Sequence, residues 1–563
     1  MSTQRTHRRT WTTLGRIIGV CVVLCFTAVY RFNTLGGRFG GFDNDHFVPF
    51  AYAKQVQAGA QPLRDFSGLG LQGAWPSLAY EASALAQRTL GNNLRSEAIV
   101  TIAGVSIAAA LTFLAASLLS TPFWALIATS ISVFVAPTLY NYPKVLMLSA
   151  VALVIAVYAR RPTVGGICGA AALSAVAFLF RHDYAAYVGV GIVLACVVHG
   201  EWRRGFQHAT LYVALTFLLL APSLVYVERH AGLAQYVREG LELSRREADR
   251  TGLSMWPRFT FTSESSSPVS AATFFDVEQN GVAWLYYLTR LLPAVVLIVV
   301  WRVVEDRHRR VAALAIAAMA ACASPFLIRG NVAVRLGDVG PLFSILFAIV
   351  CDEVVRRRSE DQRAARAIRI VLIAALLAGT ALSARTVGYV GSQMSTAGLS
   401  RSFAHTRYRT QELWRTLGTL PEAALADGVV QSPLTIAQYF NRCTMPSDRI
   451  VMMTYEPEIL PFAERLFGAG RLSVIPGYVL GERQERELVG FWQHESVPVA
   501  LSEFEEFWNP ESRDVPVIRN YLLANYRPAG DIQLTEDRRL KVFAHRQRAV
   551  VSLFGEGQLP CFR

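Results

Sequence analysis

The sequence predicts a polytopic α-helical membrane protein with a C-terminal soluble α/β domain. Of the 563 residues, 52% are apolar and only 17% are charged, whereas a soluble protein carries about 25% charged residues. Mean hydropathy is +0.31. Long apolar segments recur up to residue 385, and the composition then becomes polar. These observations exclude a soluble cytosolic enzyme.

About eleven apolar segments are predicted to cross the membrane, because about 20 apolar residues span roughly 30 Å of hydrocarbon. They lie near 14–30, 97–119, 122–137, 144–158, 163–180, 185–199, 208–228, 283–301, 311–328, 338–352 and 369–385. We therefore assign residues 1–385 to a transmembrane domain, with long outer loops at 31–96 and 229–282.

Arginine-rich connections set the predicted orientation, because short cytoplasmic loops retain Lys and Arg. The net charge is +13, and basic residues cluster before the first span and then in every second connection. Representative positions are Arg5, Arg8, Arg9, Arg160, Arg161, Arg203, Arg204, Arg307, Arg309, Arg310 and Arg356. The N-terminus is therefore predicted to be cytoplasmic, and residues 386–563 to lie outside. No small-x-small cleavage site follows the first segment in the usual place, so we read it as a retained helix.

The region 386–563 is predicted to form a small α/β layer. Apolar runs at 449–455, 472–476 and 497–501 have the character of buried strands, and PEILPFAERLF and RDVPVIRNYLLANY have that of helices. Cys443 and Cys561 both fall in this region. An oxidising outer compartment would allow them to form a disulfide, but the sequence does not supply the geometry.

The first predicted outer loop begins with FDNDHF, which places Asp43 and Asp45 two residues apart and His46 beside them. Carboxylates this close to hydrocarbon are costly unless water, a cation or a substrate meets them. Alternatively, Asp43 caps the helix predicted for FVPFAYAKQVQAG. With a phosphate, Asp43 and Asp45 could also hold Mg²⁺ or Mn²⁺. No HExxH, paired CxxC or Walker loop supports a metal further.

The rest of this loop is predicted to form short helices along the membrane surface, with Trp75 and Tyr80 facing the interface. It also carries Arg64 and Asp65. These two residues are either part of a site or simply paired with each other.

Three further groups of polar residues fall at predicted outer ends of spans. They are Tyr140, Tyr142 and Lys144; Arg181, His182 and Asp183; and Arg329, Arg335 and Asp338. Each group alone could consist of membrane-surface anchors. On one shared face, however, they would bind an anionic lipid headgroup, since the forked, always charged guanidinium of arginine suits phosphate. No GxSxG elbow points to a serine hydrolase.

With these residues in place, the chain resembles the GT-C superfamily of polyprenyl-phosphate-sugar glycosyltransferases. The family's architecture is similar in protein O-mannosyltransferases and in the lipid A aminoarabinose transferase. The resemblance rests on a first span ending in FDNDH, a following loop QVQAGAQPLRDF and a soluble C-terminal domain. Within the loop, G-x-x-P-L-R-D-F looks like the family's G-x-x-P-Y-R-D-F stretch, with Leu63 at the Tyr position. The segment GLGLQGAWP departs from the family's Tyr-Gly-Pro stretch.

The resemblance implies transfer of a sugar from a polyprenyl-phosphate donor to an acceptor hydroxyl of a cell-envelope glycan, lipid or protein, at the outer face of a bacterial inner membrane. It implies that Asp43 is the catalytic base, with Asp45 the next choice. Such a reaction needs a base for the acceptor and positive charge for the departing phosphate, and one displacement inverts the anomeric centre. The expected phosphate contacts are Lys144, Arg181, Arg329 and Arg335, with supporting roles for His46, Arg64, Asp65, His182, Asp183 and Asp338.

Three other functions remain open. A surface-glycan polymerase or ligase shares the substrate class and topology. A lipid-linked glycan transporter also needs many spans, although transporters carry their charges near the midplane. A receptor or scaffold would use the acid pair only structurally.

Overall fold

A computed structural model describes residues 2–36, 42, 44–67, 78–135, 137–199, 202–251, 256–261, 273–302, 304, 306–328, 331–356, 363–420, 433–535, 537–555 and 557–563. Contacts divide the chain into two compact units. The helical unit comprises residues 1–34, 101–221 and 251–410, and the sheet unit comprises residues 35–100, 222–250 and 411–563.

The helical unit confirms a polytopic membrane protein. Within the described ranges, nine helices are long and apolar enough to span a membrane, and Pro122–Phe134 and Val164–Phe180 are shorter apolar helices. The total of eleven spans stays a prediction. The helices are α1 (Ser2–Asn33), α4 (Leu94–Leu119), α5 (Pro122–Phe134), α6 (Tyr142–Arg160), α7 (Val164–Phe180), α8 (His182–His199), α9 (Trp202–Ala231), α11 (Glu278–Arg302), α12 (Arg307–Ala323), α14 (Gly340–Arg356) and α15 (Arg363–Val387).

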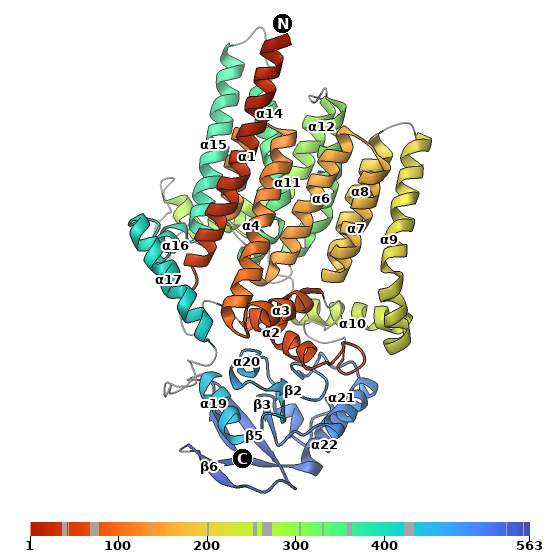
Figure 1. Cartoon of the computed structure of the whole chain (residues 1–563), viewed down its shortest axis with the longest axis vertical. Coiled ribbons are helices and arrows are strands. Elements are labelled where there is room, and N and C mark those ends of the chain that lie inside the picture. The colour runs from red at the N-terminus through yellow and green to blue at the C-terminus, as the bar shows by residue number, and fades with distance from the viewer. Residues whose placement is uncertain are drawn as a thin grey trace. The chain divides into compact units, whose positions relative to one another are not determined.

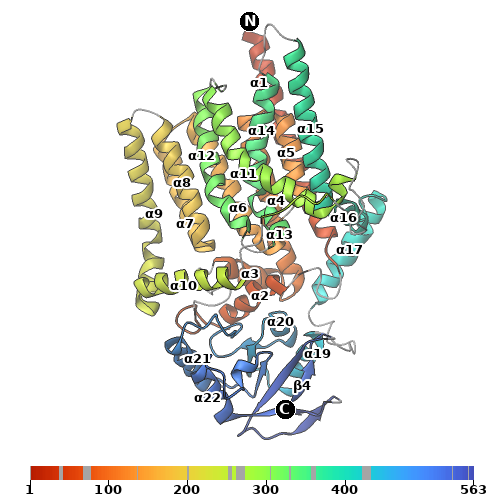
Figure 2. The ribbon, with the colours of Figure 1, turned by 180° about the vertical axis from the view of Figure 1, so that it is seen from behind.

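Helices α6, α7, α8, α11, α12 and α14 run side by side in both views (Figures 1 and 2). Helix α14 lies at the centre, because every residue from 340 to 353 is buried. Lipid supplies no hydrophobic drive between helices, so close packing depends on small residues. At Gly191 on α8, a Cβ would lie 2.3 Å from Met319 Cγ and 3.3 Å from the Ala315 carbonyl oxygen on α12. Glycine is therefore required where these helices meet.

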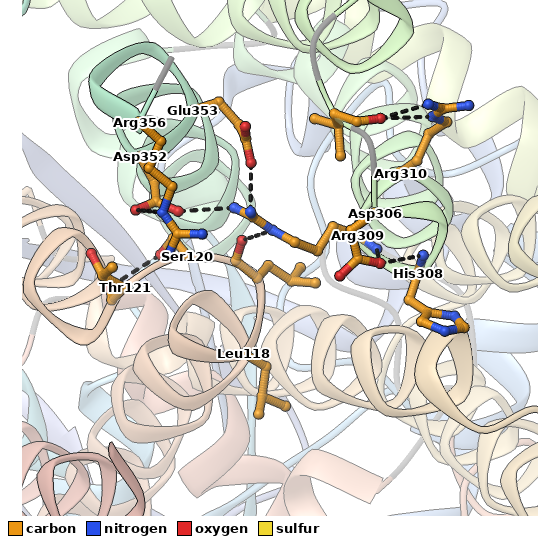
Figure 3. A network of polar contacts seen from close by, with 12 residues as sticks. Leu118, Ser120, Thr121, Asp306, His308, Arg309, Arg310, Asp352, Glu353 and Arg356 are labelled. Carbon is orange, nitrogen blue, oxygen red and sulfur yellow. Dashed lines mark hydrogen bonds and ion pairs between the residues drawn. The ribbon is translucent and has the colours of Figure 1, made fainter. Parts of the chain in front are cut away.

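A network of ion pairs and hydrogen bonds lies at the C-terminal end of α14 (Figure 3). Arg309, near the start of α12, donates from Nε to the Leu119 carbonyl oxygen at 2.7 Å and from Nη2 to Asp352 at 2.9 Å. Its Nη1 lies 2.5 Å from Glu353. Asp352 also pairs with Arg356 at 3.2 Å. This arginine thus joins the turn after α4 to α14 with all three of its nitrogens engaged.

The sheet unit contains a five-stranded mixed sheet in the order β2-β1-β3-β5-β4. Its strands are β1 (Arg449–Met453), β2 (Leu466–Phe467), β3 (Val499–Ser502), β4 (Tyr526–Gln533) and β5 (Arg539–His545). Strands β2, β1 and β3 are parallel to one another, and β5 is antiparallel to both β3 and β4. A separate hairpin joins β6 (Ser552–Phe554) to β7 (Leu559–Cys561).

The strands predicted near 449–455 and 497–501 are confirmed, but the strand predicted at 472–476 is wrong. That segment lies beside β1 and donates one backbone hydrogen bond to it, from Val474 to Met452 at 2.8 Å, without forming a ladder. The helix predicted over 457–467 is only α20 (Ile459–Ala463), because Glu464 adopts a left-handed conformation and ends it. Strand β4 was missed, since Pro528 and the bulge at Gly530 break its alternation.

The sheet unit also includes helices from the predicted outer loops. They are α2 (Asn44–Gln57), α3 (Leu78–Leu90) and α10 (Leu233–Thr251), and the C-terminal helices are α19 (Pro433–Cys443), α21 (Glu482–His494) and α22 (Pro516–Asn525). The grouping by contacts therefore differs from the boundary predicted at residue 385. Helix α16 (Val390–Thr396) belongs to the helical unit, where Gln393 accepts a hydrogen bond from Tyr30 at 2.5 Å. Helix α17 (Phe403–Thr419) begins there too.

The C-terminal end of the chain is tied to the rest of the sheet unit. Cys443 at the end of α19 and Cys561 in β7 form a disulfide across 118 residues of sequence. The neighbouring Phe562 donates its backbone N–H to the Cys443 carbonyl oxygen at 2.8 Å. This is the cysteine pairing considered from the sequence.

Candidate functional site

The helical unit contains a polar pocket where α6 and α8 begin and α7 ends. The pocket opens to solvent, and the space in and in front of it is about 420 Å³. Five of its lining residues come from the three polar groups singled out in the sequence: Lys144, Arg181, Asp183, Arg335 and Asp338. Arg329, the remaining predicted cation, lies outside the described residues. Segments up to 194 residues apart thus place their charged side chains around one cavity.

Lys144 and Asp338 form the buried part of this pocket. Lys144, in the first turn of α6, donates from Nζ to Asp338 Oδ2 at 2.8 Å, and both side chains are at most 7% exposed. Asp338 Oδ1 is also buried, and it has no hydrogen-bond partner among the described residues. A buried acceptor without a partner is costly. Asp338 is therefore a pocket-lining residue with an unused acceptor oxygen.

The other charged groups of the pocket are more accessible. Arg181 ends α7 and pairs with Asp183 in the first turn of α8 at 2.9 Å, with about half of its side chain exposed. The side chain of Arg335, on the short helix α13 (Val332–Leu336), forms no ion pair or hydrogen bond with any residue that the structure describes. Three cations and two carboxylates leave one excess positive charge, and Arg335 carries it.

Aromatic side chains complete the pocket and were not predicted as site residues. Tyr184 and Tyr187, one turn apart on α8, and Phe326 line it. Arg181 lies over the Tyr184 ring, 5.7 Å from its centroid. The spacing of the two tyrosines directly after RHD was the signal that could have identified them. His182, by contrast, packs on Phe178 with ring centroids 4.5 Å apart and does not line the pocket.

Of the two acids in the first predicted outer loop, Asp43 lies outside the described residues. Asp45 belongs to the sheet unit. Asp45 lies in the first turn of α2, where a carboxylate is favoured by the helix dipole. Its Oδ1 accepts a hydrogen bond from the Tyr455 hydroxyl at 2.6 Å. His46 is buried with its ring 4.9 Å from that of Phe42, so its position is explained by packing.

Arg64 and Asp65 pair with each other. Arg64 Nη2 lies 2.6 Å from Asp65 Oδ2, and the Gln61 backbone N–H donates to the same oxygen at 2.8 Å. The hydrogen bond from Arg64 lowers the pKa of Asp65. These contacts favour the second of the two interpretations made from the sequence, in which Arg64 and Asp65 simply pair with each other. Tyr80, expected at the interface, is instead buried against Tyr52 with ring centroids 4.8 Å apart. Trp75 lies outside the described residues.

A second polar cluster, to which the sequence assigned no chemistry, lies at the carboxyl ends of β1 and β3. Arg538 contacts Glu456 at 2.8 Å and Glu503 at 2.7 Å. Glu456 and Glu458 are both buried, and Glu458 Oε2 has no hydrogen-bond partner among the described residues. Burial, followed by the neighbouring Glu456, raises the pKa of Glu458 to about 8.

A divalent cation remains a prediction. Among the residues that the structure describes, no group of three or more His, Cys, Asp or Glu side chains is arranged to hold a metal ion. Asp45 alone of the predicted D-x-D pair is among the described residues.

Comparisons with known proteins give structural similarities only. No protein-family model and no curated protein matches the chain. It is similar to ArnT from Cupriavidus metallidurans bound to undecaprenyl phosphate, with 12% sequence identity, a TM-score of 0.49, and coverage of 94% of this chain and 97% of that chain. It is also similar to the oligosaccharyltransferase of Archaeoglobus fulgidus in the apo form, at 11% identity and a TM-score of 0.44, covering 95% and 74%. Both are GT-C superfamily members. Likenesses this distant assign this chain neither a substrate nor a site.

Proposed function

We propose that this membrane protein is a glycosyltransferase that moves a sugar from a polyprenyl-phosphate donor to an acceptor hydroxyl at the outer face of the membrane. The observation that carries the proposal is the pocket of Lys144, Arg181 and Arg335, whose excess positive charge lies on the unpaired Arg335. Positive charge fixed in advance stabilises a departing phosphate, which is where negative charge develops during transfer.

The remaining pocket atoms suit the sugar of such a donor. Asp338 Oδ1 would accept a hydrogen bond from a sugar hydroxyl, and Tyr184 and Tyr187 offer ring faces to the pyranose or furanose. Hence one pocket would provide both a phosphate contact and sugar contacts. These roles distinguish a sugar phosphate from a simple anionic lipid headgroup.

An apolar pocket in the same unit would receive the polyprenyl chain. It is lined among others by Leu285, Leu336 and Phe343. Leu336 directly follows Arg335 along α13. A lipid whose phosphate binds Arg335 could therefore place its first isoprene units against this neighbouring apolar surface.

Asp43 is our proposed general base, taking the proton of the acceptor hydroxyl in a single inverting displacement. Asp45 is the next choice. The donor's phosphate would leave as the new glycosidic bond forms, and its charge would be held by the arginines and Lys144. A cytoplasmic N-terminus and a C-terminal domain outside a bacterial inner membrane complete the proposal.

The experiment is transfer of radiolabelled sugar by the purified full chain from a panel of polyprenyl-phosphate sugars. Asp43→Asn and Asp45→Asn are compared with wild type, with and without EDTA. We expect Asp43→Asn to abolish transfer while a matched change at a surface acid, Glu482→Gln, leaves it unchanged. Loss of transfer in EDTA that is restored by Mg²⁺ or Mn²⁺ would establish the divalent cation.

Absence of turnover with every donor, together with donor movement across liposomes, would overturn the transferase and favour a transporter. Joining of whole oligosaccharides instead of single sugars would favour the polymerase or ligase.

A further inference from the structure

The connection after β1 lies at a position where α/β sheets usually place functional residues. Strand β1 has β2 on one side and β3 on the other, although β2 comes between them in the sequence. The chain therefore leaves the carboxyl ends of β1 and β3 in opposite directions. Such a switch point creates a crevice at the carboxyl ends of the strands. Residues 454–458 follow the carboxyl end of β1 at this switch point.

Ion pairs and hydrogen bonds hold this connection in place. Thr454 donates from Oγ1 to Glu503 Oε2 at 2.9 Å, and the Glu503 backbone N–H donates to the Met453 carbonyl oxygen at 3.2 Å. Arg538 from the start of the β5 segment donates to both carboxylate oxygens of Glu503, at 2.7 and 2.8 Å, and pairs with Glu456. The residues on both sides of Tyr455 are thus anchored to the sheet.

Tyr455 uses this fixed position to contact the start of α2. Its hydroxyl donates to Asp45 Oδ1 at 2.6 Å, a length typical of a charge-assisted bond from a hydroxyl to a carboxylate. The next turn of α2 packs on α20, where the rings of Phe47 and Phe462 are 5.7 Å apart. At the far end of α2, Gln55 donates to the Phe467 carbonyl oxygen at 2.9 Å. Contacts at both ends therefore fix the helix that carries Asp45.

We infer that Tyr455 is a positioning residue for the transfer reaction, orienting the Asp45 carboxylate in the first predicted outer loop. This inference rests on the proposed function and extends it, because it makes the C-terminal sheet part of the catalytic apparatus. Arg538 acts one step further away, through Glu456, Glu503 and the connection that carries Tyr455.

The test measures donor and acceptor kinetics of full-length Tyr455→Phe. We expect kcat to fall about tenfold to a hundredfold, the effect of losing one hydrogen bond to a charged group, with the donor KM little changed. Tyr521→Phe is the matched control, because this partly buried tyrosine of the same unit makes no hydroxyl hydrogen bond among the described residues. If Tyr455 acts through Asp45, the Tyr455→Phe, Asp45→Asn double variant is no slower than Asp45→Asn.

A second readout does not depend on turnover. Hydrogen exchange at the first turn of α2 should accelerate by about tenfold in Tyr455→Phe and in Asp45→Asn, with no further change in the double variant. The inference would be overturned if Tyr455→Phe had the exchange rate and the kcat of the wild type. It would also be overturned if the losses of kcat in the two single variants multiplied in the double variant. If exchange accelerates as expected but the wild-type protein transfers no sugar, the coupling of Tyr455 to Asp45 stands and the proposed function is refuted.

Discussion

Helix α14 has a charged cluster near each end, and the two clusters differ in whether a pocket and an unpaired arginine adjoin them. At the N-terminal end, Asp338 pairs with Lys144 through one oxygen, and its other oxygen is buried without a described partner. At the C-terminal end, Arg309 directs its three nitrogens to Leu119, Asp352 and Glu353 (Figure 3).

This difference distinguishes a candidate binding site from a polar network that stabilises the fold. Both clusters contain Arg or Lys beside buried carboxylates, so charge and burial alone do not distinguish them. The N-terminal cluster adds a pocket and an arginine, Arg335, with no described partner. An unpaired arginine beside a pocket indicates a ligand, whereas an arginine whose three nitrogens all contact protein partners indicates a structural role. The predictions below follow from this distinction, from the largest expected effect on transfer to the smallest.

Arg335→Gln should reduce kcat/KM for transfer about a hundredfold, because it removes the one excess positive charge available to the leaving phosphate. The measurement is initial rate against donor concentration. Arg246→Gln is the control, since Arg246 is exposed and, among the described residues, pairs only with Glu242 one turn away. Equal kcat/KM in Arg335→Gln and Arg246→Gln would show that Arg335 has no role in transfer.

Lys144→Met should lower donor affinity about tenfold and also destabilise the protein, because breaking a buried pair costs about 3–5 kcal/mol. Donor titration and thermal unfolding in detergent measure the two effects. The double variant Lys144→Met, Asp338→Asn removes both members of the buried pair, so neither leaves its partner charged and alone, and it should regain stability but not donor binding. If it regained both, the pair would be purely structural.

Arg309→Met should leave kcat/KM of the folded protein within about twofold of wild type, because the substitution lies at the other end of α14 from the pocket. It should nevertheless lower thermal stability as strongly as Lys144→Met, since Asp352 and Glu353 lose their shared partner. A large loss of transfer without loss of stability would contradict the distinction between the two clusters.

Glu458 tests a third case, a buried carboxyl with an unused oxygen in the sheet unit. Its pKa is raised from 4.5 to about 8 by burial and by Glu456. Between these pH values the folded chain keeps a proton that the unfolded chain has lost, so stability should decrease as pH rises and level off above about 8.

Glu458→Gln should flatten this slope while transfer at neutral pH is unchanged. Melting temperatures measured from pH 5 to pH 9 check the prediction, with exposed Glu482→Gln as the control. Identical slopes in wild type and Glu458→Gln would show that Glu458 titrates equally in both states.

Local patterns predicted most of the fold. Apolar length predicted the membrane helices, and the change in composition predicted a sheet-containing C-terminal region. Strand β1 was found because RIVMM is a continuous apolar run, but β4 was not, because Pro528 and Gly530 interrupt it. The two residues of β2 are too short for any periodicity, and only pairing with β1 makes them a strand.

The candidate site was predicted as residues but not as contacts. Lys144, Arg181 and Arg335 were selected because polar residues recur at span ends on one face, which is a property of the sequence. The same reasoning could not separate Arg64 from them, although the structure pairs Arg64 with its neighbour Asp65. It also assigned nothing to Tyr455, whose role depends on a distant partner.

The sequence by itself determined that the chain crosses a membrane many times, that its charges gather at span ends and that an acid pair follows the first span, since all three are set by composition and spacing. Only the tertiary structure decided that Lys144 pairs with Asp338 across 194 residues and that Tyr455 reaches Asp45 across 410. Such contacts depend on which helices and strands pack together and in which register. Side chains three to four residues apart on one helix cannot encode that information, because periodicity fixes a face and not its partner.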